Sequence, residues 1–342
     1  MPIHIDSIAF LVAAMCAGVM GFAIQRGATC TVAAIDEVVG MRGVNRLAAM
    51  FAASLWVAGG LLVAHAFGVL GKMPAGYPVT LATIAGGVLL GLGAYVNRAC
   101  VFGAIARFGS GEWAYAVTPL GFYAGCVAFG WIAAYAPHEA LPQGSPLFAA
   151  SPWLALLFVA FAAWRIARLF RLDPEVAQGF AARLRSAASM RLWTPHAATT
   201  VIGVTFVVML LVVGAWAYTD ALADLARNMT MNALARSLLL IALLGGATLG
   251  GWTAGRFRAT SISVPQVARC FGGGALMGLG TLLIPGSNDG LILIGLPLLW
   301  PYAWVAFLTM CVSIGAVKLV ERSATTRATN ERNPTRSTGV RP

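Results

Sequence analysis

Four segments of the chain place a glycine nine residues before a small side chain that carries a thiol or a hydroxyl group. They are Gly21–Cys30, Gly91–Cys100, Gly251–Thr260 and Gly278–Ser287. In each one, an apolar run of helical character breaks into a short polar stretch. Polar backbone inside a membrane is tolerated only where protein or a water-filled pathway lines it. Two breaks in each half of the chain are the pattern by which many transporters build a central site.

The residue types within the breaks favour a small anion. Arginine or an amide side chain in apolar surroundings is costly unless it is paired or hydrated, which makes it a candidate for a pathway. Helix ends that point inward would add free N–H groups that attract negative charge. The same arginines would also fit cytoplasmic helix ends, with their side chains reaching the membrane surface. The candidate pathway residues of this kind are Arg26, Asn97, Arg98 and Asn288.

The two cysteines at matched positions, Cys30 and Cys100, indicate the chemistry of that anion. A thiol is a weak, soft hydrogen-bond donor, and apolar surroundings keep it protonated and neutral. A neutral thiol does not repel an anion and suits a large, polarizable acceptor atom. Together these residues predict a pathway for an anion that contains sulfur, with Ser287 and Thr260 as the hydroxyl-bearing counterparts in the second half.

The composition predicts an all-α polytopic membrane protein. Of 342 residues, 59% are hydrophobic and only 10% are charged, whereas a soluble protein has about 25% charged residues. A bilayer-spanning helix needs about 20 apolar residues. We expect about nine transmembrane helices plus short broken or re-entrant helices, in two pseudo-symmetric halves. The expected spans are 7–24, 47–71, 81–96, 113–136, 148–171, 197–218, 237–254, 267–284 and 303–320, with a half-helix at 290–300.

The positions of the charged residues predict how the chain divides into parts and how it is oriented in the membrane. Residues 1–171 form the expected N-terminal half, 172–196 a basic cytoplasmic linker, 197–320 the C-terminal half, and 321–342 a disordered cytoplasmic tail. The net charge of +11 gathers in the linker and the tail, so the positive-inside rule places both in the cytoplasm. The arginines form no stripe on a soluble face, which argues against a nucleic-acid partner. The expected partner surface is the lipid bilayer.

The sequence gives little support for an enzyme, a metal site or a redox centre. The six cysteines show no CxxC or other metal-ligand spacing, and none lies in an evident extracellular loop. No zinc-protease, nucleophile-elbow or phosphate-binding loop motif occurs. We therefore expect no catalytic residue, no metal and no cofactor, and without an ATP-binding domain the chain cannot be a primary pump by itself.

Three segments carry a family resemblance. GFAIQRGATCTVAAIDE and LLGLGAYVNRACVFGAIARFGSGE resemble motifs of the YeeE/YedE family of sulfur-compound permeases, and GGGALMGLGTLLIPGSNDGL resembles its C-terminal motif. The resemblance covers residues 7–317. It implies an hourglass-shaped thiosulfate permease of the bacterial inner membrane, in which cysteines pass the substrate along by S–H···S hydrogen bonds. It also implies a small cytoplasmic sulfur-carrier partner of the TusA type.

The sequence departs from the family motifs at one position. Cys30 and Cys100 match the cysteines of the first two family motifs, but Ser287 stands where the third motif has a cysteine. A hydroxyl is a harder donor than a thiol, and Asp289 adds negative charge nearby. A related sulfur species or a selenium compound therefore remains an alternative substrate to thiosulfate. Two further alternatives are an intramembrane cysteine sulfurtransferase and a membrane scaffold that recruits a sulfur carrier.

Overall fold

The structure is a computed structural model that describes residues 7–130, 139–149, 153–171, 192–227 and 232–332, and every regular element in these ranges is helical. The first part of the chain forms α1 (Ile8–Gly27), α2 (Thr31–Met41), α3 (Asn45–Ala66), α4 (Leu81–Asn97), α5 (Val101–Gly109), the short η1 (Trp113–Ala116), α6 (Val117–Ala128), η2 (Pro146–Ala149) and α8 (Trp153–Arg171). The second part forms α10 (Pro195–Val213), α11 (Tyr218–Ala226), α12 (Ala233–Thr253), α13 (Val264–Leu283), α14 (Asn288–Gly290), the π-helical turn η3 (Leu291–Gly295) and α15 (Pro301–Arg332).

Several helices start where side chains supply the missing backbone partners. The Ser7 hydroxyl accepts a hydrogen bond from the Phe10 N–H at the start of α1, at 3.1 Å. Thr80 and Thr83 form a reciprocal capping box at the start of α4. Thr194 caps α10 just ahead of Pro195, whose missing N–H is no loss in the first turn. These caps set the ends of helices whose interiors are almost wholly apolar.

Six helical segments are long and apolar enough to span a membrane, or seven if the bent pair α13 and α14–η3 counts as one span. The predicted count of nine spans is therefore too high over the described residues. Two of the six contain a break: the segment from α1 to α2 and the segment from α4 to α5 each qualify as one span. The broken spans predicted at Cys30 and Cys100 are thus present as backbone features.

Two predicted spans differ in extent from the helices that the structure describes. Within 113–136, the α6 helix has only 12 residues, or about 18 Å, against a hydrocarbon core about 30 Å thick. Residues 131–138 of that predicted span lie outside the described residues. Within 148–171, α8 forms a helix over Trp153–Arg171, and the side chains beyond Arg165 lie outside the described residues.

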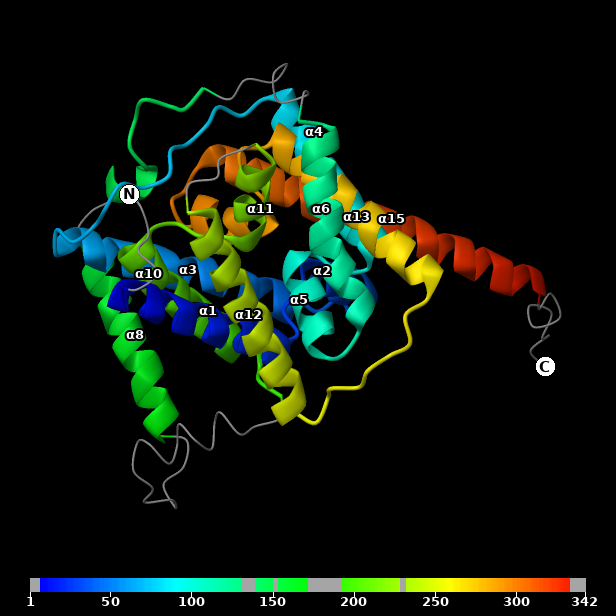
Figure 1. Cartoon of the computed structure of the whole chain (residues 1–342), viewed down its shortest axis with the longest axis horizontal. Coiled ribbons are helices and arrows are strands. Elements are labelled where there is room, and N and C mark those ends of the chain that lie inside the picture. The colour runs from blue at the N-terminus through cyan, green and yellow to red at the C-terminus, as the bar shows by residue number, and fades with distance from the viewer. Residues whose placement is uncertain (1–6, 131–138, 150–152, 172–191, 228–231, 333–342) are drawn as a thin grey trace, which may run out of the picture.

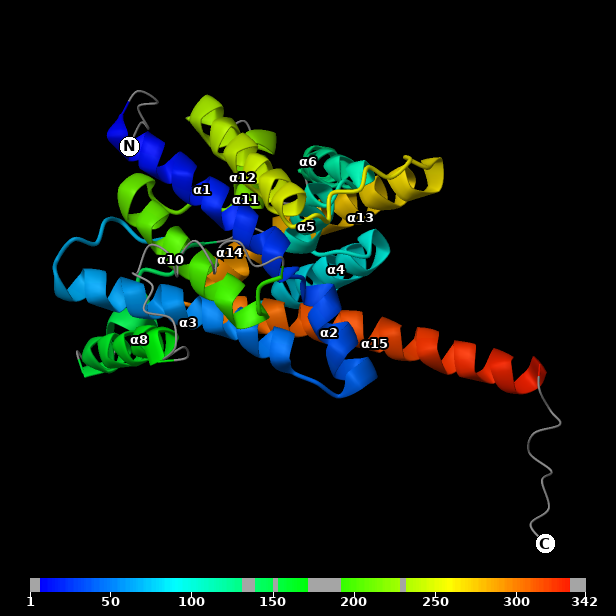
Figure 2. The same cartoon turned by 90° about the horizontal axis from the view of Figure 1, so that it is seen from below.

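The C-terminal part also differs from expectation. α15 continues to Arg332, although the sequence predicts a disordered tail from residue 321. No glycine or proline occurs between 316 and 333, and Pro334 is the first residue that opposes a helix. Figures 1 and 2 both show the end of α15 extending away from the other helices. The remaining tail and nearly all of the predicted linker, 172–191, lie outside the described residues.

Helix packing is reciprocal between the two parts of the chain. α1 of the first part packs against α12 of the second, and α10 of the second part packs against α3 of the first. Likewise α13 packs against α6 and α4 against α15, while α1 with α10 and α4 with α13 form the central contacts. Figure 2 shows α1, α12 and α10 on one side of α14 and α4 and α13 on the other. The breaks after α1, α4, α10 and α13 are thereby brought towards one region.

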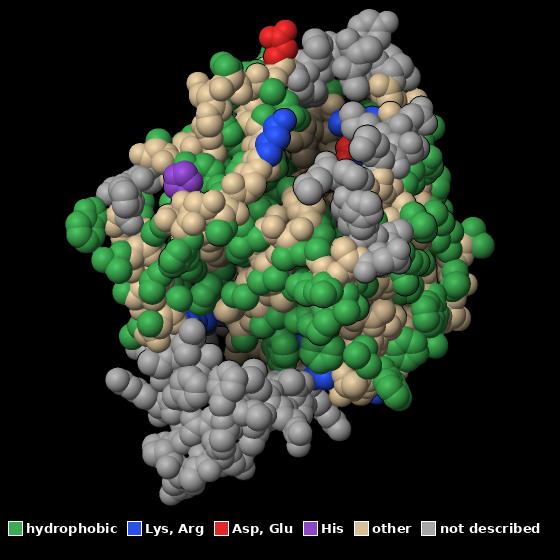
Figure 3. Space-filling view, turned by 60° about the vertical axis from the view of Figure 1, so that its left-hand side comes forward, with side chains coloured by type: hydrophobic (Ala, Val, Ile, Leu, Met, Phe, Trp, Pro, Cys, Tyr) green, Lys and Arg blue, Asp and Glu red, His purple; other side chains and the backbone are tan. Residues whose placement is uncertain are grey.

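Small residues allow these helices to approach closely, as their spacing predicts. A Cβ atom added to Gly246 of α12 would lie 1.8 Å from the Gly18 carbonyl oxygen of α1, and one at Gly21 would lie 1.9 Å from the Leu243 oxygen. Neighbouring Gly245 faces outward with nothing within 4 Å. Figure 3 shows a largely hydrophobic face, as a bilayer-facing surface requires.

The Gly246 contact can be tested directly. Gly246→Val should lower the thermal stability of the detergent-purified protein, because the new side chain must push α1 and α12 apart, at a cost of about 1–3 kcal/mol or more. Gly245→Val, one residue away, should leave the melting temperature nearly unchanged. Equal melting temperatures for the two variants would contradict the packing.

Candidate functional site

Three of the residues selected from the sequence occupy the same structural position. Cys30, Cys100 and Ser287 each directly precede the first turn of the helix that follows a break, and each has an extended backbone. All three are buried, with at most 9% of the residue exposed. Each of them therefore lies at the junction between two pieces of a broken helix.

The two cysteine breaks share a backbone conformation. The residue that follows α1, Ala28, has φ of 46°, and the residue that follows α4, Arg98, has φ of 59°, both in the left-handed region. Asn97 stabilises the second break: its amide donates to the Ala99 oxygen at 2.8 Å and accepts from the Thr118 hydroxyl at 3.0 Å. The buried asparagine therefore supports the turn that presents Cys100.

Cys30 and Cys100 meet. The Cys100 sulfur accepts a hydrogen bond at 3.1 Å from the N–H of Thr31, the residue that follows Cys30. That N–H lies at the start of α2 and has no partner within its own helix. Gly103 leaves room for the pair, since a Cβ atom there would lie 2.5 Å from the Cys30 sulfur. The sulfur at the second break thus caps α2, the helix that follows the first break.

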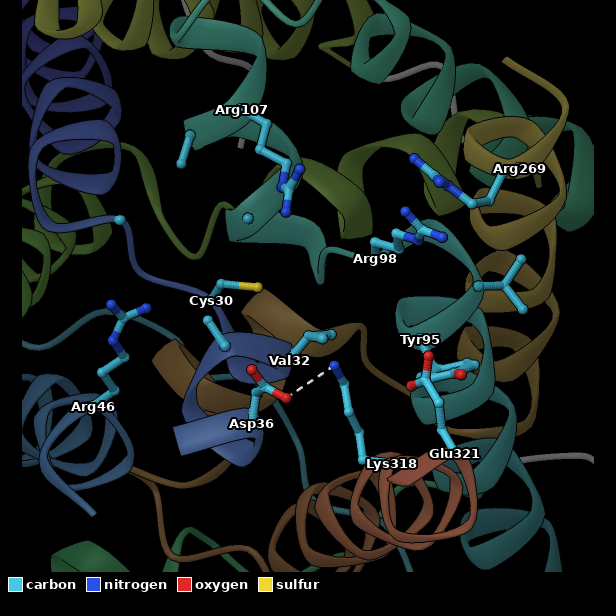
Figure 4. A pocket seen from close by; sticks show the side chains of 15 residues that line it. Cys30, Val32, Asp36, Arg46, Tyr95, Arg98, Arg107, Arg269, Lys318 and Glu321 are labelled. Atoms are coloured by element: carbon cyan, nitrogen blue, oxygen red, sulfur yellow. Dashed lines mark ion pairs between the residues drawn. The ribbon is translucent and has the colours of Figure 1, made fainter. Parts of the chain in front are cut away.

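A cavity of about 800 Å³ leads to Cys30. Its wall includes five basic side chains and only two acidic ones, and Figure 4 shows them around the Cys30 sulfur. Lys318 is bound to Asp36 at 3.0 Å, and Arg107 to Glu112 at 3.2 Å. The basic residues, from α3, the second break, α5, α13 and α15, are Arg46, Arg98, Arg107, Arg269 and Lys318. We call this space the basic cavity.

A second cavity, of about 310 Å³, lies towards the opposite ends of the same helices. Tyr302 of α15 and Thr281 of α13 line it, whereas Lys318 and Arg269 of those helices line the basic cavity. Sixteen residues separate the two positions on α15, or about 24 Å of helix. We call this space the far cavity.

The fourth break forms a polar cluster at the far cavity. The Ser287 hydroxyl oxygen lies 2.6 Å from one carboxyl oxygen of Asp220 and 2.6 Å from one of Asp289. The Ser287 N–H also donates to Asp220, at 3.0 Å, and the Thr219 hydroxyl donates to Asp289. Asn288 is fully buried, and neither polar atom of its amide has a hydrogen-bond partner.

Backbone groups beyond this break receive partners from distant elements. The carbonyl oxygen of Ile292 accepts from the Ser54 hydroxyl of α3 at 2.7 Å, and that of Leu298 accepts from Ser145 at 2.6 Å. These bonds satisfy the irregular backbone around η3 within an apolar core. They hold α14 and η3 at the centre of the molecule.

Comparison with known protein families identifies the family of the chain. The family model described as sulphur transport matches residues 26–316. The chain belongs to the sulphur transport family. No curated protein sequence matches it. This sulphur transport protein is a multi-pass membrane protein, and the family assignment fits a transporter.

Two predicted pathway residues of the sulphur transport protein lie elsewhere. Arg26 is 1% exposed and donates to the Thr253 hydroxyl at 2.7 Å, and it lies over the Phe22 ring. Thr260 is exposed, and its N–H bonds to the Gly111 oxygen. The predicted break at Gly251–Thr260 is an ordinary connection, because α12 completes a full span before it begins. Arg98 and Cys30, by contrast, both line the basic cavity.

The structure of this sulphur transport protein also reveals residues that sequence patterns leave out. A break between Val213 and Tyr218 follows α10, where the sequence suggests continuous helix to 218. It positions Asp220, an acidic residue beside apolar runs, which is a signal for function in membrane proteins. Arg269 and Lys318 carry no local motif, so only tertiary packing brings them to Cys30.

The charge of the basic cavity gives a prediction. With Cys30 as the sole cysteine, an anionic methanethiosulfonate reagent should modify it faster than a cationic one. Arg269→Gln should reduce that rate ratio about twofold to fivefold, since a charge pair a few ångströms apart in hydrated surroundings is worth about 1 kcal/mol or less. Arg236→Gln, whose arginine pairs with Asp224, should leave the ratio unchanged. If the anionic and cationic reagents modify Cys30 at equal rates before Arg269 is replaced, the prediction that basic side chains control access to Cys30 is wrong.

Proposed function

We propose that the protein is a permease for a small sulfur-containing anion, with thiosulfate as the first candidate. The observation that carries the proposal is the basic cavity, which ends at Cys30, with the Cys100 sulfur bonded to the next backbone N–H behind it. Five cationic side chains around this cavity favour a dianion over a neutral solute. The two thiols then offer soft donors where the cavity ends.

Thiosulfate matches this arrangement at both of its ends. Its three oxygens carry most of the charge and suit guanidinium donors such as Arg107 and Arg269. Its terminal sulfur is large and polarizable and suits a thiol donor. Cys30 and Cys100 would each hold that sulfur in turn through an S–H···S hydrogen bond, with no covalent step. A selenium analogue shares the soft terminal atom and is a competing substrate to be tested.

The proposed route continues to Ser287 and the far cavity. In this proposal the chain consists of two related halves, 1–171 and 197–320, and their facing cavities give the molecule an hourglass form. The reciprocal packing of α1 with α12 and of α10 with α3 supports this division. Asn97 serves as a positioning residue for Cys100, and Asn288 is a buried amide at the fourth break.

The basic side is proposed to face the cytoplasm of a bacterial inner membrane. Arg46 and Lys318 lie on that side, together with Arg322 near the end of α15, as the positive-inside rule favours. A small sulfur-carrier protein of the TusA type would then collect the substrate at the basic cavity. A sulfurtransferase activity is less well supported, because no histidine lines the described basic cavity to act as a base.

Uptake by purified protein in liposomes tests the proposal. Labelled thiosulfate should enter, and Cys100→Ala should slow entry at least about tenfold, equivalent to about 1.4 kcal/mol. Cys311→Ser is the matched control, because Cys311 lies on α15 away from both cavities, and it should transport normally. Unlabelled sulfite, sulfate and selenium analogues added in competition rank the substrates.

Two results would count against this function. Normal uptake by a protein that carries both Cys30→Ala and Cys100→Ala would remove the thiol relay. No uptake of any sulfur or selenium anion by folded protein would remove the permease proposal itself.

A further inference from the structure

The far cavity contains an arrangement that an anion pathway does not explain. Asp220 from α11 and Asp289 from α14 both contact Ser287 at the break. Asp220 is half-buried and lines the far cavity, whereas Asp289 is 2% exposed. Two ionised carboxylates would repel a passing dianion, and two buried carboxyls this close do not both ionise readily.

The hydrogen atoms in this cluster can be counted. Each 2.6 Å contact between the Ser287 oxygen and a carboxyl oxygen is short enough to be a hydrogen bond and therefore contains a hydrogen. A serine hydroxyl supplies only one. A hydrogen on one of the two carboxyl groups would complete both contacts, so this arrangement favours one proton on the pair of aspartates.

A second observation points to an occupant at this place. Asn288 lies between Ser287 and Asp289 in the sequence, is 0% exposed, and has no partner for either atom of its amide. A buried amide without hydrogen bonds is costly, and this one leaves an unused donor and an unused acceptor next to Ser287 and Asp289. Gly290 adds space, since a Cβ atom there would lie 2.4 Å from an Asp220 carboxyl oxygen.

Other titratable and charged groups surround the cluster from each neighbouring element. Asp224 and Arg227 follow Asp220 at one wall of the far cavity, and Asp224 is paired with Arg236 of α12. The remaining groups are two tyrosines at the same cavity, one tyrosine beside Asp289 and two thiols, namely Tyr77, Tyr302, Tyr218, Cys100 and Cys126. Within the described residues of the far cavity, Arg227 is the one cation among these groups.

We propose that Asp220, Ser287 and Asp289 form a proton-binding site that couples anion passage to proton movement. A proton from the far cavity reaches the pair through the half-buried Asp220 and leaves it singly protonated, and the anion then passes the cluster without meeting two carboxylates. The proton leaves with the anion towards the basic cavity, so both move in the same direction. The inference rests on the proposed permease function and adds its driving force.

Uptake assays in proteoliposomes distinguish proton coupling from thiosulfate transport itself. Acid outside and neutral inside should accelerate thiosulfate entry by the parent protein several-fold, and a trapped pH dye should report proton entry on addition of thiosulfate. Asp220→Asn should keep thiosulfate exchange at equal pH but lose both responses, because its amide donates permanently to Ser287 as a protonated carboxyl does. Asp224→Asn, one turn further along α11, should retain both responses.

Each outcome decides between the two proposals. Thiosulfate entry that ignores the pH gradient in the parent protein overturns the coupling and leaves the permease standing. If no thiosulfate enters at all, the permease proposal fails, and infrared titration without substrate still tests the proton site.

A protonated carboxyl band that is lost in Asp220→Asn but kept in Asp224→Asn supports the site, and a spectrum without that band overturns it. Ser287→Ala, which removes the bridge, gives a second variant should Asp220→Asn fold poorly.

Discussion

Unpaired backbone groups at the ends of broken helices are the constraint on which this structure depends. Inside an apolar core, each helix end exposes N–H and carbonyl groups that must find partners. Cys100 supplies one by accepting from the Thr31 N–H at the start of α2. Ser54 and Ser145 supply others around η3. The side chains that stabilise the breaks therefore lie at the place where a pathway would run.

This constraint links the fold to its chemistry. A helix that breaks and restarts presents its first residue to the centre, and at two such positions that residue is a cysteine. The close approach of α1 to α12 and of α4 to α13 then brings the separate breaks together, which requires glycines at the contacts. The basic cavity and the far cavity occupy the spaces on either side of this central region, and their opposite charge character suits different steps of one transport process.

Sequence patterns locate the cysteine breaks well, because both depend on local features. A glycine-rich apolar run followed by Arg or Asn and a cysteine predicts a helix that stops and restarts, and α1–α2 and α4–α5 do so. The same pattern at Gly251–Thr260 is misleading, since α12 is already long enough to span the membrane. The break after α10 is missed, because apolar residues on both sides of Gly214 resemble one continuous helix.

The sequence by itself determined an all-helical membrane protein, its sulfur-related motifs and the residues Cys30, Cys100 and Ser287. These follow from composition and from spacing along one segment, which local physical preferences control. Only the tertiary structure decided that Cys30 meets Cys100, that Arg107, Arg269 and Lys318 surround the approach to them, and that Asp220 reaches Ser287 across 67 residues of chain. Such meetings depend on how helices pack against one another, and no spacing within a single segment encodes that arrangement.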